Sequence, residues 1–405
     1  MMAREKIHVG LEIGTTKVCA VVAECRRDGE VRLLGVGESP SRGVRKGEIV
    51  DFQNASNCVH DALSDAEERS DHEIKSVWLA VTGSHIESSN HRRSVNIEGG
   101  GEITEKEIED IASKDKEVSL PKDNDILHSI LQQYYVDGRE GVIDPIGIGG
   151  SKLEADYHII HGVVNRIQST IRCVRKIGID VEDVVVNSVA SAQILLDDQK
   201  KASGVVVIDI GGGVTDYIVY HNGVVRQSGV IAIGGDHITN DLCIGLRIPI
   251  TRAEKLKIEE GSAILENLSG AEKITLKNDT GFSGKEIDRS MLNHIIHSRL
   301  HELFLILRNR IQEVVPVHLL GSGIILTGGC SLIKGIREVA ESVFEVPVHF
   351  AHAQSVTGPT SAFDNPQLST CIGLVKYAHA VDADAPQESF FNRFISSITR
   401  KLHLI

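Results

Sequence analysis

Residues 205–220 join an apolar strand to a second strand through three consecutive glycines, Gly211–Gly213. Glycines let a ligand approach the backbone closely, and successive N–H groups form a concavity suited to an anion. Asp209 precedes this turn, and Thr215 and Asp216 follow it, which supplies carboxylates for a hydrated metal ion. An ordinary hairpin turn has the same local pattern, so the segment needs support from elsewhere in the chain.

That support is an internal repeat near the N-terminus. Residues 12–17, Glu-Ile-Gly-Thr-Thr-Lys, repeat the order seen from Asp209 to Thr215: carboxylate, isoleucine, glycine, small turn residues and a returning strand. Walker loops and dinucleotide-binding loops run from a strand into a helix, whereas both of these turns run from strand to strand. The repeat therefore excludes those two classes and predicts two similar halves, each offering a phosphate-binding hairpin to one nucleotide.

A third glycine turn follows the strand 324–327. Gly328 and Gly329 come next, and we expect Ser331 to cap a helix over 332–344. Open backbone at a helix N-terminus suits a ribose or a phosphate, although an ordinary α/β connection looks similar. Three such turns, two of them repeats, favour a nucleotide site.

Composition narrows the class of protein. The chain has 405 residues, enough for two or three domains, and a net charge of −13, which argues against a nucleic-acid-binding surface on its body. Its seven cysteines never form a Cys-x-x-Cys pair, so we expect neither a disulfide framework nor a zinc site. We therefore expect the protein to reside in a reducing compartment. We find no secretory signal and no apolar run of the roughly 18 residues that span a bilayer.

Alternation of strands and helices predicts an α/β fold with a parallel or mixed sheet. Within the later part of the chain we expect one long helix over 285–315. The expected division is a first half (1–83 and 166–197), an inserted subdomain (84–165), a second half (198–235 and 311–380), a further subdomain (236–310), a linker (381–389) and a terminal helix (390–405).

The terminal segment 390–405 is amphipathic on a helical wheel. One face carries Phe391, Phe394, Ile395, Ile398, Leu402 and Ile405, and basic residues include Arg393, Arg400 and Lys401. A helix docked on the protein's own surface is the alternative, but the acidic linker and the basic residues favour an anionic membrane interface. One such helix binds reversibly, and polymerisation would convert many weak anchors into strong avidity.

These motifs resemble the nucleotide-binding set of the actin, sugar-kinase and heat-shock-chaperone ATPase superfamily. Within it, the chain is similar over essentially its whole length to the bacterial cell-division family FtsA, on the segments 9–17, 41–47, 207–213, 253–257 and 325–329 and the amphipathic tail. The resemblance implies an actin-like ATPase fold: two duplicated ribonuclease-H-like halves around a nucleotide cleft, with inserted subdomains. Glu12 stands where the superfamily usually has aspartate, so the rate of any ATP hydrolysis stays open, and weak or no ATPase activity is expected.

The resemblance also implies the ligands and their residues. ATP would be bound by Gly14, Thr15, Thr16, Lys17, Asp209, Gly211, Gly212, Gly213, Thr215, Glu254, Lys257, Gly328 and Gly329. Asp209 and Glu12 would hold Mg²⁺ through water. Glu254 and Lys257 would face the ribose and adenine, and Gly328 and Gly329 would border the adenosine.

The partners implied by the resemblance are the C-terminal tail of the tubulin-like protein FtsZ, further copies of the chain in filaments, and other division proteins that contact the inserted subdomain. Lys285, Arg289 and Arg299 are basic positions for the FtsZ tail, unless they form an ordinary solvated face. The expected role is to polymerise at the division site, peripherally on the cytoplasmic face of the inner membrane, and to anchor the FtsZ ring there. A scaffold of another envelope machine, of the pilus-assembly type, and a small-molecule kinase are the alternatives.

Overall fold

The structure is a computed structural model. It describes residues 6–26, 30–114, 118–265, 272–278, 282–353, 355–358 and 365–383. The predicted terminal helix, residues 390–405, and most of the linker before it lie outside the described residues. Within the described part, no helix is both long enough and apolar enough to cross a membrane.

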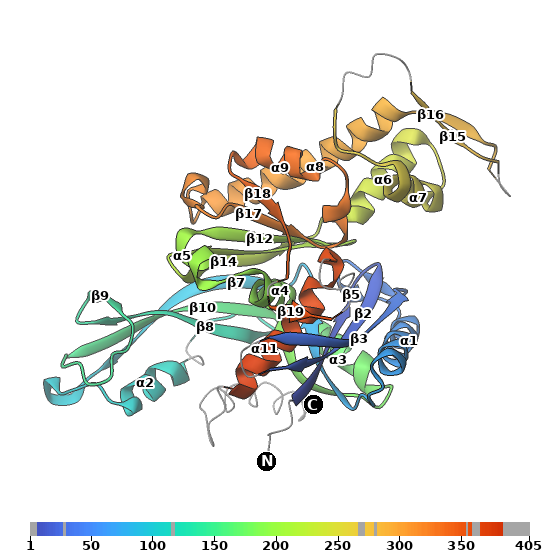
Figure 1. Ribbon diagram of the computed structural model, residues 1–405. Helices are drawn as coiled ribbons and strands as arrows, with labels where there is room; N and C mark the ends of the chain where they lie inside the picture. The colour runs from blue at the N-terminus through green and yellow to red at the C-terminus, as the bar shows by residue number, and fades with distance from the viewer. Residues whose placement is uncertain are drawn as a thin grey trace.

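The first half is built on a six-stranded mixed sheet (Figure 1). In spatial order its strands are β11 (Asp180–Val186), β6 (Ser76–Val81), β1 (Lys6–Ile13), β2 (Lys17–Cys25), β3 (Val31–Pro40) and β19 (Val356–Thr357). β1, β2 and β3 form an antiparallel meander, whereas β1, β6 and β11 run parallel. The turn between β1 and β2 therefore lies at the edge of the sheet where the parallel strands β6 and β11 also end.

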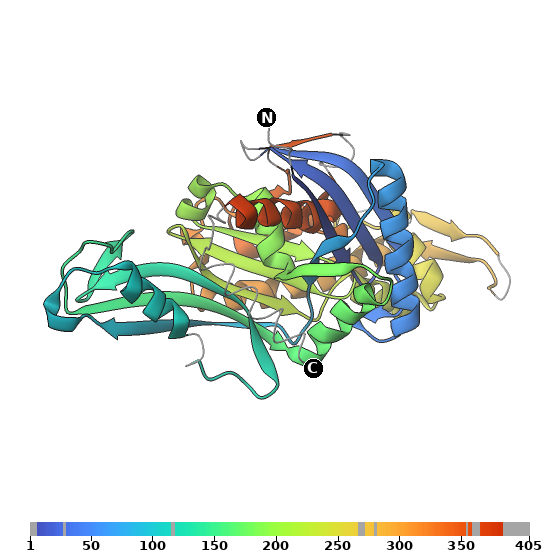
Figure 2. The same ribbon diagram turned by 90° about the horizontal axis from the view of Figure 1, so that it is seen from below.

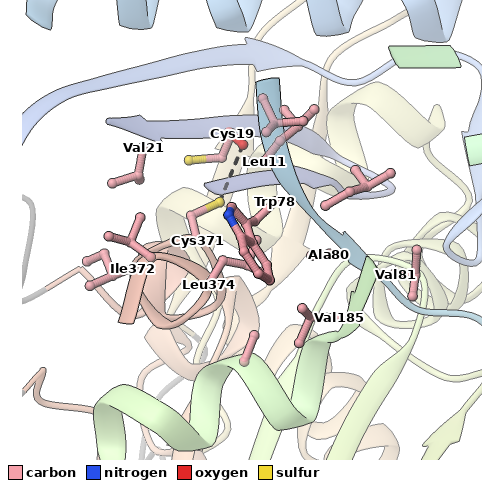
Figure 3. Packing of buried hydrophobic residues seen from close by; sticks show 14 of the residues in the cluster. Leu11, Cys19, Val21, Trp78, Ala80, Val81, Val185, Cys371, Ile372 and Leu374 are labelled. Atoms are coloured by element: carbon pink, nitrogen blue, oxygen red, sulfur yellow. Dashed lines mark hydrogen bonds between the residues drawn. The ribbon is translucent and has the colours of Figure 1, made fainter. Parts of the chain in front are cut away.

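Helices cover both faces of this sheet (Figure 2). α1 (Phe52–Ser70) and α3 (Val164–Arg175) pack together on one face, and α4 (Asn187–Leu195) and α11 (Ser369–Ala383) pack together on the other. α1 begins where the Asp51 side chain accepts a hydrogen bond from the Asn54 N–H at 3.1 Å. Figure 3 shows the buried side chains beneath α11, where the Cys371 Sγ donates to the Cys19 carbonyl at 3.3 Å. All seven cysteines are free.

The second half repeats this arrangement in a five-stranded sheet. Its spatial order is β14 (Val224–Ile231), β13 (Thr215–His221), β12 (Val205–Ile210), β17 (Ile324–Thr327) and β18 (Val348–Phe350). β12, β13 and β14 form an antiparallel meander and β12 runs parallel to β17, just as β1 runs parallel to β6. The duplication predicted from two short motifs therefore extends to the strand order of both halves.

The inserted segment forms its own antiparallel sheet. The order is β7 (Glu87–Asn96), β10 (Lys152–Val163), β8 (Asn124–Val136) and β9 (Arg139–Val142), with α2 (Glu105–Ala112) packed against it. Its β7 side meets β14 of the second half: the Ser88 hydroxyl donates to the Ser228 carbonyl at 2.6 Å. The buried His158 ring lies between the Asn90 Oδ1 (2.7 Å) and the Ser228 Oγ (2.9 Å). Polar contacts thus tie the insertion to the second half.

Two predicted helices need correction. Residues 285–288 do not begin a long helix: they form β16 (Lys285–Asp288), which pairs with β15 (Lys273–Leu276), and α8 runs over Arg289–Gln312. The helix expected over 332–344 begins only at residue 336, as α9 (Ile336–Phe344). Gly335, directly before it, has a φ of 82°, which a right-handed helix does not allow. Ser331 lies in the short 3-10 turn η4 (Gly329–Leu332), where its hydroxyl donates to the Gly328 carbonyl at 2.7 Å.

Candidate functional site

The two glycine hairpins meet face to face between the halves. Each turn is closed by one backbone hydrogen bond, from the Gly14 N–H to the Lys17 carbonyl (2.9 Å) and from the Gly211 N–H to the Val214 carbonyl (3.0 Å). A Cβ atom added to Gly212 would lie 2.4 Å from the Cγ2 of Thr16. The absence of a side chain at this glycine is what lets the hairpins approach so closely.

A cavity of about 1620 Å³ lies at this junction and extends along α6 (Gly235–Leu246) and α7 (Ile250–Glu260). All of the ATP and metal residues expected from the sequence line it except Thr215. Those that line it are Glu12, Gly14, Thr15, Thr16, Lys17, Asp209, Gly211, Gly212, Gly213, Glu254, Lys257, Gly328 and Gly329. Residues far apart in the sequence are therefore brought to a single cavity.

Thr215 is the exception. Its side chain is fully buried in β13, and its hydroxyl donates to the Ile233 carbonyl at 2.8 Å, so it stabilises the strand pair rather than facing the cavity. The residue beside it, Asp216, lines the cavity instead. Alternation along a strand explains the exchange, because successive side chains point to opposite faces.

Three of the carboxylates in the cavity wall, those of Glu12, Asp209 and Asp216, have raised pKa values and lie on or next to the strands that form the two hairpins. Burial raises the pKa of Glu12 to about 7, and the neighbouring charge of Asp209 adds to the effect. Burial also raises the pKa of Asp209 to about 6 and raises that of Asp216 well above its usual range. Each of them accepts a hydrogen bond from a neutral side chain: Glu12 from Asn187 (3.1 Å), Asp209 from Thr370 (3.1 Å) and Asp216 from Thr82 (2.7 Å).

This excess of buried negative charge fits a divalent cation. Among the described residues, no group of three or more His, Cys, Asp or Glu side chains converges closely enough to hold a metal ion directly. Mg²⁺ usually keeps several of its waters and is held through one or two carboxylates, so Asp209 and Glu12 suit a hydrated Mg²⁺. A cation there would stabilise both carboxylates in the charged form.

The two lysines expected to bind ATP, Lys17 and Lys257, are each paired with a carboxylate. The Lys17 Nζ lies 2.7 Å from the Glu38 carboxylate and 3.4 Å from the Gln367 carbonyl, which holds the ammonium group at the edge of the first hairpin. The Lys257 Nζ donates to the Thr239 hydroxyl at 2.8 Å and to the Glu254 carboxylate at 2.7 Å. Both lysines are therefore positioned by their own neighbours.

The start of α6 braces the second hairpin. The Gly235 N–H donates to the Gly211 carbonyl at 2.9 Å, and the Asp236 N–H donates to the Gly212 carbonyl at 2.7 Å. The carbonyl oxygens of the turn are thus held toward α6. A Cβ atom added to Gly328 would lie 2.3 Å from the Asp209 Oδ1, so the third turn also reaches the carboxylate end of the cavity.

The three basic positions proposed for partner binding are already engaged in part. Arg289 contacts the Glu260 carboxylate at 2.7 Å and lines the cavity, while Arg299 contacts the Asp241 carboxylate at 2.6 Å. The Lys285 Nζ donates to the Leu246 carbonyl at 2.7 Å, which leaves its charge without an acidic partner in the described part of the chain.

Sequence reasoning missed the neutral side chains that bind the carboxylates. Asn187 directly follows β11, so its place at the carboxyl end of a parallel strand was the available signal. Thr82 directly follows β6, which is also a parallel strand, so the same signal was available for it, whereas Thr370 lies in α11 and no local pattern links it to the glycine turns. Asp216 stands next to the turn and was expected among its metal-binding carboxylates, but the resemblance gave it no ligand.

Comparisons with known proteins agree with this architecture. A family described as cell division protein FtsA matches residues 206–373, and the SHS2 domain inserted in FtsA matches residues 83–161. The cell division protein FtsA of Pseudomonas aeruginosa is 34% identical over 97% of this chain and 94% of its own length. That of Borreliella burgdorferi is 36% identical over 93% and 92%, and that of Escherichia coli 33% over 92% and 90%.

Solved structures confirm the actin-like ATPase fold. A PilM–PilN type IV pilus biogenesis complex superposes with a TM-score of 0.64 at 13% identity, covering 95% of this chain and 100% of the other. MreB5 of Spiroplasma citri bound to ADP superposes with a TM-score of 0.56 at 16% identity, covering 94% and 98%. About a third of the residues are identical to those of named FtsA proteins along nearly the whole length, so the chain belongs to the FtsA family of cell division proteins.

Proposed function

We propose that the cavity binds ATP with Mg²⁺ and that the bound nucleotide favours closure of the two halves. The observation that carries the proposal is the meeting of two duplicated glycine hairpins at one cavity, beside the buried carboxylates of Asp209 and Asp216 and the half-buried carboxylate of Glu12. The two structures of MreB5 from Spiroplasma citri, one bound to ADP and one to AMPPNP, support a nucleotide in this fold.

The residues divide the binding task. N–H groups of Thr15 and Thr16 in the first turn and of Gly212 and Gly213 in the second turn would hold the phosphates, while Asp209 and Glu12 would orient the water shell of Mg²⁺. Bound Mg²⁺ would neutralise phosphate charge between the halves. Because the hairpins belong to different halves, a ligand that contacts both has more contacts in the closed arrangement, and this difference in affinity shifts the equilibrium toward closure.

The first experiment measures ATP binding with and without Mg²⁺. Asp209→Ala is expected to weaken the Mg²⁺-dependent binding of ATP. The matched control is Asp198→Ala, which removes a fully exposed carboxylate from the short helix α5 (Asp198–Ser203). Equal ATP affinity in the wild type and in Asp209→Ala would mean that the second hairpin is structural only.

We further propose that the chain polymerises on the cytoplasmic face of the inner membrane and attaches the FtsZ ring to it. Family membership supports a role in division, and the amphipathic segment 390–405 supports the membrane contact. The segment 390–405 has three basic and no acidic residues, so the body is more negative than the total of −13 and is repelled by anionic lipid, but this repulsion fades over about 8 Å. Each basic residue near the leaflet contributes about 1 kcal/mol, and apolar insertion adds to it.

Deletion of residues 390–405 tests the anchor. The shortened chain should lose co-sedimentation with anionic liposomes while its ATP binding stays intact, because the cavity residues are all outside the deleted segment. Liposome binding retained after the deletion would place the membrane contact elsewhere.

The FtsZ contact is best tested at Lys285, the basic position without an acidic partner in the described residues. Lys285→Glu should weaken binding of a peptide with the sequence of the FtsZ C-terminal tail, because an acidic side chain repels the acidic groups of that peptide. Lys200→Glu, on α5 of the second half, is the control. No binding of the peptide to the wild type would instead favour a scaffold of another envelope machine.

A further inference from the structure

The segment 41–47 belongs to the first half but lies between the two hairpins. The Ser41 N–H donates to the Thr16 carbonyl at 3.0 Å, and the Gly47 N–H donates to the Thr15 Oγ1 at 3.1 Å, so the segment is fixed to the first hairpin. On its other side, a Cβ atom added to Gly213 would lie 2.9 Å from both the N and the Cα of Lys46. The backbone of Lys46 therefore touches the second hairpin.

Lys46 occupies a position whose backbone does not favour lysine. β4 (Val44–Arg45) and β5 (Glu48–Ile49) pair as a small hairpin, and its two turn residues, Lys46 and Gly47, have φ values of 51° and 76°. Two consecutive positive φ angles define the type I′ turn, for which Asn-Gly is the preferred sequence. Turn geometry thus gives no reason for a lysine here.

The Lys46 side chain is half-buried and lines the cavity. Within the described part of the chain it has no ion pair and no hydrogen bond, in contrast to Lys17, which is paired with Glu38. Its neighbour Arg45 also lines the cavity but is exposed. Burial lowers the pKa of His237 on α6, and the positive charge of Lys46 lowers it further.

We propose that Lys46 binds the terminal phosphate of a nucleoside triphosphate and so makes closure of the two halves depend on that phosphate. The Lys46 ammonium group lies beside two glycine turns and is suited to bind a terminal phosphate, whose two negative charges the backbone N–H groups alone would not neutralise. The contact would join the segment 41–47 to both hairpins at once. This inference rests on the proposed nucleotide function and adds to it a means of telling ATP from ADP.

The test compares Mg·ATP and Mg·ADP affinities by calorimetric titration of the full chain. Lys46→Asn removes the cation and creates the Asn-Gly sequence that the turn prefers, so the midpoint of urea unfolding should be unchanged or raised. We expect ATP affinity to fall about ten- to hundredfold, as for the loss of one charge-assisted hydrogen bond, and ADP affinity to stay the same.

The matched control is Arg42→Asn, which removes a basic side chain of the same segment that does not line the cavity; both affinities should be unchanged. Equal losses of ATP and ADP affinity in Lys46→Asn, or no loss of either, would overturn the assignment while leaving the nucleotide function in place. A wild type that binds neither nucleotide would overturn the nucleotide function itself, and the assignment of Lys46 with it.

Discussion

We expect the Asp209 carboxylate, which is proposed to hold the metal ion through water, to lower the free energy of unfolding of the ligand-free protein. The Asp209 side chain is 8% exposed, and in the ligand-free protein it faces a cavity wall that also contains Glu12 and Asp216. Asp209→Asn keeps the size of the side chain, and the amide oxygen can still accept the hydrogen bond from Thr370. The substitution should therefore stabilise the ligand-free protein at neutral and alkaline pH.

The magnitude follows from the shift in pKa. Burial raises the pKa of Asp209 from 3.8 to about 6, and a difference of about two units corresponds to about 3 kcal/mol. The folded state keeps its proton up to about pH 6, whereas the unfolded chain loses it near pH 3.8. Because the folded state binds more protons in this window, wild-type stability should fall as pH rises from about 4 to about 6 and then level off for this group.

Urea unfolding of the metal-free and nucleotide-free chain between pH 4 and pH 8 measures this effect. Asp209→Asn should have the higher midpoint at pH 8, by an amount that corresponds to about 3 kcal/mol, and the difference should vanish near pH 4. Saturating Mg·ATP should reduce or reverse the difference, because the wild type binds the ligand more tightly. A variant that is less stable than the wild type at pH 8, or a difference that does not depend on pH, would refute the reasoning.

Three further substitutions test the packing around the site. Gly212→Ala should hold the hairpins apart and weaken nucleotide binding, measured by calorimetric titration with Mg·ATP. Adding Thr16→Ser removes the clashing methyl group and should restore the affinity; a double variant that still binds weakly would contradict the proposed contact. His158→Ala leaves the hydroxyl of the buried Ser228 and the amide oxygen of Asn90 without their partner and should reduce the free energy of hydrogen-exchange protection of β7 by about 1–3 kcal/mol, against unchanged protection in β12. Gly373→Ala places a Cβ atom 2.0 Å from a carbonyl oxygen of α4 and should lower the free energy of unfolding by about 1–3 kcal/mol. Gly149→Ala, whose added Cβ atom would have no atom within 4 Å, should leave the free energy of unfolding unchanged.

Local signals predicted the elements that carry the site. Strand-to-strand glycine turns identified both hairpins. The start of α2 also has a local signal, the capping box of Thr104 and Glu107, in which the Glu107 carboxylate accepts from the Thr104 N–H at 2.9 Å. The long helix expected from residue 285 was wrong because residues 285–288 are held as a strand by pairing with β15. Such pairing depends on a segment separated by a loop, which helical periodicity does not register.

The sequence alone determined the duplicated halves and the list of chemical groups at the site, because glycine, carboxylate and strand patterns are local properties of the chain. Only the tertiary structure decided which groups share the cavity: Asp216 rather than Thr215, and Asn187 and Thr370 as partners of Glu12 and Asp209. It also placed Lys46 against Gly213. Burial, the physical cause of the raised carboxylate pKa values, exists only once both halves are folded against each other, so no single segment encodes it.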